Sequence, residues 1–206
     1  MDRGDYNSSL SRGAWFSDYL QWISTHLNGR KEMNERNNHS VCWFVQAASF
    51  GVFTENQSMM ELCRESYKHT LLPEQMAEDG SFPHELCRTK PYSYSNFVLD
   101  NMVTLCHILS TPADNLWEYT LPDGRSIRKG MEFLFPYLTD KDSWPYQQDI
   151  EHYEDWPVGM SYPLFAGLAW GKEEYVNLWR HLEQSPTNEE VRRNMAIRQP
   201  LLWVID

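Results

Sequence analysis

The chain lacks the features that mark membrane proteins and nucleic-acid-binding proteins. Its longest apolar run, 164–170, is far shorter than the ~20 residues of a membrane-spanning helix. The polar, acidic N-terminus predicts no signal peptide. Basic residues are few, with 18 Lys and Arg against 29 Asp and Glu, and the net charge is −11. Because phosphate binding needs a basic stripe, we expect neither nucleic acid nor a membrane among its partners.

Cysteine is scarce and is spaced wrongly for zinc. Cys42, Cys63, Cys87 and Cys106 form no C-x-x-C pair, and no phosphate-binding glycine loop or hydrolase elbow is present. We therefore expect no metal and no cofactor. Three of the cysteines fall within helical apolar patterns, which favours buried free thiols. Two disulfides remain the alternative if the chain is exported.

Strand-like alternation is nearly absent, and helical periodicity takes its place. Apolar residues recur every three or four positions in six stretches, 12–27, 41–52, 60–71, 98–109, 126–138 and 175–182. Pro73 is expected to end the third helix, and Thr187 or Asn188 can cap a further one. The pattern predicts one all-α domain over 1–206, built of helical hairpins packed side by side.

Two long connections, 73–91 and 140–160, are where we expect function in such a domain. The second carries an acidic cluster: Asp149, Glu151, His152, Glu154 and Asp155. A solvated loop is the simpler interpretation, since no EF-hand pattern is present, and a divalent cation site is the alternative. The cluster is followed by Trp156, an aromatic residue of the kind that stacks on sugar rings.

The most informative residues lie in two short segments, Asn37-Asn38-His39 and 88–94, the latter reading R-T-K-P-Y-S-Y. Together they offer an amide, an imidazole, a guanidinium and a phenol. That set suits removal of a proton beside a carboxylate, because cationic and hydrogen-bonding groups hold the anion while His or Tyr moves the proton. Taken singly, each residue has a structural interpretation: a helix cap for the Asn pair, a surface ion pair for Arg88 and half-buried aromatics for the tyrosines.

These segments resemble the alginate lyase superfamily of polysaccharide lyases. Asn38 and His39 align with its carboxylate-binding Asn and catalytic His, and Arg88 and Tyr94 with its charge-neutralising Arg and catalytic Tyr. The stretches 79–86 and 198–203 are also similar to the family. The R-T-K-P-Y-S-Y-S version looks closer to the branch that includes glucuronan lyases.

The resemblance implies a fold, an incomplete (α/α) toroid of antiparallel helical hairpins. This chain would supply roughly the C-terminal two-thirds of it. An open toroid edge would expose apolar surface and favour self-association. A periplasmic or secreted location is implied by the family alone.

The resemblance also implies a reaction, β-elimination on 4-linked uronate chains such as alginate, polymannuronate or glucuronan, which leaves a 4,5-unsaturated end. Asn38 and Arg88 would hold the carboxylate, and His39 would complete this clamp or act as base. Tyr94 would donate a proton to the departing O4 and, where the C5 proton and O4 share a face, also act as base. Further substrate-binding candidates are Asn37, Lys90, Tyr92 and Trp156.

Two other functions stay open. The chain can be a catalytically impaired remnant that binds uronates without turnover. Alternatively, it can be a glycosidase on a similar helical toroid, which needs paired acids across a cleft. Asp149 with Asp155 is the pair that such an enzyme would use.

Overall fold

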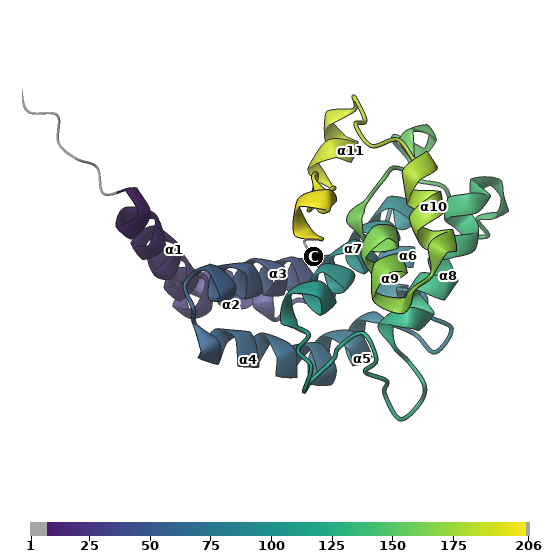
Figure 1. The fold of residues 1–206 in the computed structure, drawn as a ribbon. Helices are drawn as coiled ribbons and strands as arrows, with labels where there is room; N and C mark the ends of the chain where they lie inside the picture. The colour runs from purple at the N-terminus through teal and green to yellow at the C-terminus, as the bar shows by residue number, and fades with distance from the viewer. Residues whose placement is uncertain (1–7, 205–206) are drawn as a thin grey trace, which may run out of the picture.

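The computed structural model of the protein describes residues 8–204, with side chains from residue 13, and the regular elements of this part are all helical (Figure 1). The α-helices are α1 (Ser8–Thr25), α2 (Leu27–Met33), α3 (Asn38–Phe53), α4 (Gln57–Ser66), α5 (Leu72–Gln75), α6 (Pro83–Leu86), α7 (Pro91–Leu109), α8 (Ile127–Thr139), α9 (Ser161–Trp170), α10 (Glu173–His181) and α11 (Glu189–Arg193). A π-turn, η1 (Tyr67–Leu71), and three 3₁₀ turns, η2 (Lys141–Ser143), η3 (Tyr153–Asp155) and η4 (Pro200–Trp203), complete the order.

The first predicted helix is two helices. The chain turns at His26, whose extended backbone and side chain cap α2, so Leu27 is not part of the buried stripe and is 80% exposed. Of the other members predicted for this stripe, Leu20 and Ile23 are buried and Phe16 is half-buried. Helix α3 packs against α1, α2, α4 and α7 and buries Val41, Phe44 and Ala48 as predicted. The last member of its predicted stripe, Val52, is 48% exposed, so the prediction is wrong there.

Pro73 does not end the third predicted helix. The π-turn η1 follows α4 directly, and α5 then continues to Gln75 with Pro73 in its first turn. Proline is tolerated there because the first N–H groups of a helix have no partner within it. The expected ending is therefore wrong, and the continued helix brings Gln75 against α3, where its Nε2 donates to the Asn37 carbonyl (3.1 Å).

The central element is α7, which packs against α3, α6, α8 and α9. Because other helices surround α7, the helix begins well before the predicted 98–109 and includes a stretch rich in polar residues. Ser95, Asn96 and Asp100 are all buried on it. Asn96 and Asp100 accept hydrogen bonds from α9, as buried polar groups usually do, whereas the Ser95 hydroxyl has no partner among the described residues. One such bond joins the Tyr162 hydroxyl to Oδ1 of Asn96 (2.6 Å).

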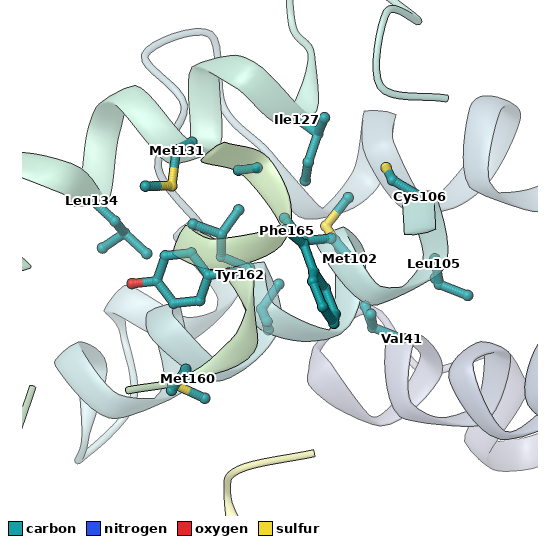
Figure 2. Close-up of a cluster of buried hydrophobic side chains, with 14 of the residues drawn as sticks. Val41, Met102, Leu105, Cys106, Ile127, Met131, Leu134, Met160, Tyr162 and Phe165 are labelled. Carbon is teal, nitrogen blue, oxygen red and sulfur yellow. The ribbon is translucent and has the colours of Figure 1, made fainter. Parts of the chain in front are cut away.

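The main core lies where α7, α8, α9 and α3 meet (Figure 2). Its labelled members are Val41, Met102, Leu105, Cys106, Ile127, Met131, Leu134, Met160, Tyr162 and Phe165. Burying one large apolar side chain contributes roughly 1.5–3 kcal/mol. The core thus fixes the direction of α7, whose first turn leads into the candidate site.

Two carboxylates cap helices from a distance. Asp149 accepts the backbone N–H groups of Tyr92 (2.8 Å) and Ser93 (3.0 Å) at the start of α7. Asp100 does the same for Tyr162 (2.9 Å) at the start of α9, and burial raises the pKa of Asp100 to about 6. Because these N–H groups have no partner within their helices, each carboxylate stabilises the helix that it caps.

All four cysteines are free thiols. Cys63 and Cys106 are buried, Cys42 is half-buried and Cys87 is exposed. Burial raises the pKa of the first three thiols to about 12. The prediction of free thiols is confirmed. Among the described residues no helix combines the length and apolar character needed to cross a membrane.

Candidate active site

The segment Asn37-Asn38-His39 forms the start of α3. Asn37 has an extended backbone and is the N-cap, with its side-chain oxygen accepting the His39 N–H (3.2 Å). Asn38 is the first helical residue and is 7% exposed. The structural interpretation of Asn37 therefore holds, and the cap turns Asn38 inward and His39 outward.

The amide of Asn38 is held by a carboxylate from α6, just before the second segment. Oε1 of Glu85 accepts the Asn38 backbone N–H (2.8 Å) and Nδ2 (3.1 Å), and Oε2 accepts Nδ2 as well (3.0 Å). Glu85 lies on the short helix α6 and is 0% exposed. The backbone N–H of Arg88 donates to the Glu85 carbonyl (3.0 Å). Glu85 thus joins the two segments that the sequence had singled out.

His39 lies at an open cleft of about 160 Å³. Its Nδ1 is 2.6 Å from Oε2 of Glu32 on α2, and both side chains are about half exposed. The cleft is also lined by Tyr19, Trp22 and Trp43. With Nδ1 turned to the carboxylate, the ring nitrogen left for a ligand is Nε2.

Arg88 and Tyr94 face one another. The guanidinium carbon of Arg88 lies 4.8 Å from the centroid of the Tyr94 ring, and both residues are half-buried. Tyr94 stands in the first turn of α7, with its N–H bonded to the Lys90 carbonyl (3.1 Å). A cation over an aromatic face is attracted to the ring quadrupole. The contact places a positive charge beside a phenol.

Lys90 links this pair to the C-terminal part of the chain. Its Nζ lies 2.9 Å from Glu151 and 3.6 Å from Glu190 on α11, which lies above α7 in the view of Figure 1. The Glu151 carboxylate is the main cause that raises the pKa of Lys90. Lys90 is therefore a fixed cation that already has acidic neighbours.

The structure thus connects Asn38, His39, Arg88 and Tyr94 in one chain of contacts. His39 follows Asn38 on α3, Asn38 binds Glu85, the turn from Glu85 leads to Arg88, and Arg88 covers Tyr94. Of these four residues, His39 alone is among those that line the cleft.

Tyr92 and Trp156 do not belong to this surface. Tyr92 is 0% exposed, its hydroxyl donates to the Tyr137 carbonyl (2.9 Å), and burial raises its pKa. Its ring is packed edge-on against Trp144. Trp156 is 4% exposed. The structure does not support a substrate contact for either residue, because both aromatic rings serve the core.

The acidic cluster divides between a helix cap and the surface. Asp149 is buried and caps the start of α7, and Asp155 accepts a hydrogen bond from Asn188 (2.8 Å). Both carboxylates of the pair considered for a glycosidase therefore form hydrogen bonds within the protein. In the part of the chain that the structure describes, no group of three His, Cys, Asp or Glu residues is placed to hold a metal ion.

Sequence reasoning missed Glu85, Glu32 and Gln75 as parts of the site. Glu85 stands in the stretch 79–86, which was noted for its family resemblance, yet nothing local indicates that its carboxylate is buried. Glu32 lies on α2, the helix before α3, and from the sequence alone such an acidic residue is expected to face solvent. Only the packing of α2, α5 and α6 around the start of α3 reveals these three.

Comparison with known proteins agrees with this arrangement. Residues 7–144 match the alginate lyase family. Among solved structures the chain is similar to the crystal structure of an alginate lyase from Bacteroides ovatus, at 26% identity and a TM-score of 0.74. The alignment covers 92% of this chain and 50% of that one, so the chain spans about half of the enzyme's length. No curated protein matches the sequence.

The structural likeness confirms the predicted fold class, an all-α, incomplete (α/α) toroid of antiparallel helical hairpins. The matched residues cover most of the chain and include both segments of the site. The chain belongs to the alginate lyase family.

Proposed function

We propose that this protein is a polysaccharide lyase that cleaves 4-linked uronate chains by β-elimination. The observation that carries the proposal is the Arg88 guanidinium over the Tyr94 ring, joined through Glu85 to Asn38 and His39. Membership of the alginate lyase family supports the same reaction class. A periplasmic or secreted location is part of the proposal and rests on the family alone.

The reaction needs a positive group at the sugar carboxylate, because the proton on C5 is too weakly acidic to leave beside a full negative charge. Arg88 supplies that charge, and its fork of N–H groups matches a carboxylate. In this proposal Tyr94 protonates O4 of the departing sugar, which requires its hydroxyl to come within hydrogen-bond reach of that atom in the complex. His39 supports the carboxylate or takes the C5 proton through Nε2.

The sugar decides how the proton transfers are divided. In β-D-mannuronate and β-D-glucuronate, the C5 proton and O4 lie on the same face, so Tyr94 alone can remove one proton and deliver the other. In α-L-guluronate they lie on opposite faces, and His39 and Tyr94 must act separately. We propose the first group of sugars, because the contact between Arg88 and Tyr94 puts the cation and the proton-transferring phenol side by side.

A second candidate is a uronate-binding protein without turnover. Its support is that the chain spans half of the enzyme that it resembles and that Lys90 already contacts two carboxylates. Calorimetry with an oligouronate would then give binding heat while no unsaturated product forms.

The experiment is a lyase assay on polymannuronate, polyguluronate and glucuronan, followed by ultraviolet absorbance of the unsaturated ends. We expect Tyr94→Phe to lower turnover by at least about 100-fold while binding is kept, because proton transfer contributes 10²–10⁴-fold. Arg88→Ala should weaken both binding and turnover.

The matched controls are Tyr119→Phe and Arg180→Ala, at a half-buried tyrosine and an exposed arginine outside the site. Both should leave turnover unchanged. A flat absorbance trace on all three polymers, with a related lyase active in parallel, would refute catalysis by this chain. Saturated ends among the products would point to a glycosidase.

A further inference from the structure

The Glu85 carboxylate is a buried acid in direct contact with Asn38 of the candidate site. It is 0% exposed, and its three side-chain hydrogen bonds among the described residues all come from Asn38. Nothing in the β-elimination derived above uses this group. Glu85 lies between Asn38 and the turn that carries Arg88, so a change in its charge alters the electrostatic environment of both residues.

The hydrogen bonds fix the orientation of the Asn38 amide. Both Glu85 oxygens lie at hydrogen-bond distance from Nδ2, so the donor side of the amide is turned toward the buried carboxylate. The acceptor side, Oδ1, is therefore turned away from it. A uronate carboxylate that approaches Asn38 needs donors, and in this orientation it meets an oxygen. The ligand-free amide has the wrong polarity for the anion.

The charges around Glu85 favour its neutral form once an anion binds. Burial raises the pKa of Glu85, while hydrogen bonds from Asn38 and the positive charges of Arg88 and His84 offset only part of that effect. From α3 the group is faced by the thiol of Cys42, whose own pKa burial and the charges of Glu85 and Glu32 raise to about 12. A second carboxylate within a few ångströms raises the pKa of the first further, because like charges oppose one another.

We propose that Glu85 is a positioning residue for Asn38 and that it takes up one proton when a uronate carboxylate binds beside Arg88. The proton comes from solvent and bonds to Oε2 of Glu85, and no other covalent bond changes. The new O–H donates to Oδ1 of Asn38 after the amide has turned over, while Oε1 keeps the Asn38 backbone N–H. The amide NH₂ group then faces the anion. This inference rests on the proposed function for its ligand.

The test is calorimetry of oligouronate binding by the Tyr94→Phe chain, in which turnover is stopped. Titrations at equal pH in two buffers of different ionisation heat give the number of protons taken up per ligand. We expect uptake that approaches one proton in the pH window between the ligand-free and ligand-bound pKa of Glu85. Because binding takes up a proton, the affinity in that window falls by up to about tenfold for each unit by which the pH rises.

Glu85→Gln, in the same background, imitates the protonated acid. Its amide can donate to Oδ1 of Asn38 and accept the Asn38 backbone N–H. We expect binding to be kept, proton uptake to vanish and the pH dependence of affinity to flatten. Glu85→Leu removes the positioning contacts and should weaken binding. Glu173→Gln, at an exposed carboxylate on α10, is the matched control and should keep the full uptake.

The outcomes separate the two proposals. Binding without proton uptake across the pH range, or unchanged uptake in Glu85→Gln, overturns the role of Glu85 and leaves the lyase intact. Absence of binding overturns the proposed function and this inference together. A ligand-free readout judges the coupling itself, because the side-chain amide resonances of Asn38 should titrate with the Glu85 carboxyl in NMR spectra. Circular dichroism shows whether each variant is folded.

Discussion

The imidazole of His39 is oriented by Glu32, at 2.6 Å from Nδ1. Both side chains are about half exposed, so water screens the pair and its contribution to stability is small, ~0–1 kcal/mol. The pair matters because it fixes the orientation of the His39 ring. A ring held at Nδ1 presents Nε2 to the cleft in one defined orientation, which is how carboxylates support catalytic histidines in general.

We therefore expect Glu32→Ala to lower kcat up to about tenfold with little change in KM, because ~1.4 kcal/mol of lost orientation equals one factor of ten. Glu32→Gln keeps an acceptor oxygen and should restore most of the loss. Steady-state kinetics on the preferred uronate polymer measure both constants. Glu35→Ala, at a nearby acid outside the cleft, is the control. An unchanged kcat in Glu32→Ala would argue against the pair.

At the scale of elements, the connection before α6 decides where Glu85 and Arg88 stand. Gly80 lies in it with φ of +89°, and a Cβ built there would be 2.3 Å from the Lys129 carbonyl oxygen on α8. Gly124 has the same φ of +89°, but nothing lies within 4 Å of its Cβ position. A comparison of substitutions at the two glycines therefore separates the cost of a positive φ from the cost of a steric clash.

We expect Gly124→Ala to lower the free energy of unfolding by about 1 kcal/mol, the cost of a left-handed backbone for a residue with a Cβ. Gly80→Ala adds a clash with backbone and should cost clearly more, about 3 kcal/mol. Urea unfolding measures both. Activity at saturating substrate should also fall in Gly80→Ala, since α6 must shift. An equal loss of unfolding free energy in the two variants would show that α8 moves enough to relieve the contact with residue 80.

At the scale of the whole molecule, the N-terminal end is unusually aromatic on its surface. Trp15 is 58% exposed and Phe53 is 56% exposed. The Phe16 ring joins them, with centroids 4.9 Å from Trp15 and 5.0 Å from Phe53. A contiguous apolar surface of this kind favours association with another protein surface. We propose that two copies of the chain associate through this aromatic end.

Sedimentation velocity tests the association. The weight-average sedimentation coefficient should rise with protein concentration, and the double variant Trp15→Gln with Phe53→Gln should remove most of that rise without changing net charge. Leu168→Gln with Leu201→Gln removes exposed apolar side chains elsewhere, at 52% and 61% exposure, and serves as control. A rise that persists equally in both double variants would place the contact on another face.

The sequence by itself determined most of the longer helices and the chemical groups of the candidate site. Helical periodicity is local, so the steps between Val41, Phe44 and Ala48 predicted the buried face of α3 correctly. The segments that hold Asn38, His39, Arg88 and Tyr94 were likewise visible from their residue types and order. Pro73 was misjudged because a π-turn changed the context in which it stands.

Only the tertiary structure decided which of these groups are buried in the core and which are partly exposed. Tyr92 and Tyr94 stand two positions apart with the same side chain, yet one hydroxyl is locked on a backbone carbonyl and the other ring lies beneath Arg88. The partner of Asn38 is 47 residues away along the chain. Burial and hydrogen bonds between distant segments depend on how helices pack, and no local pattern of residues carries that information.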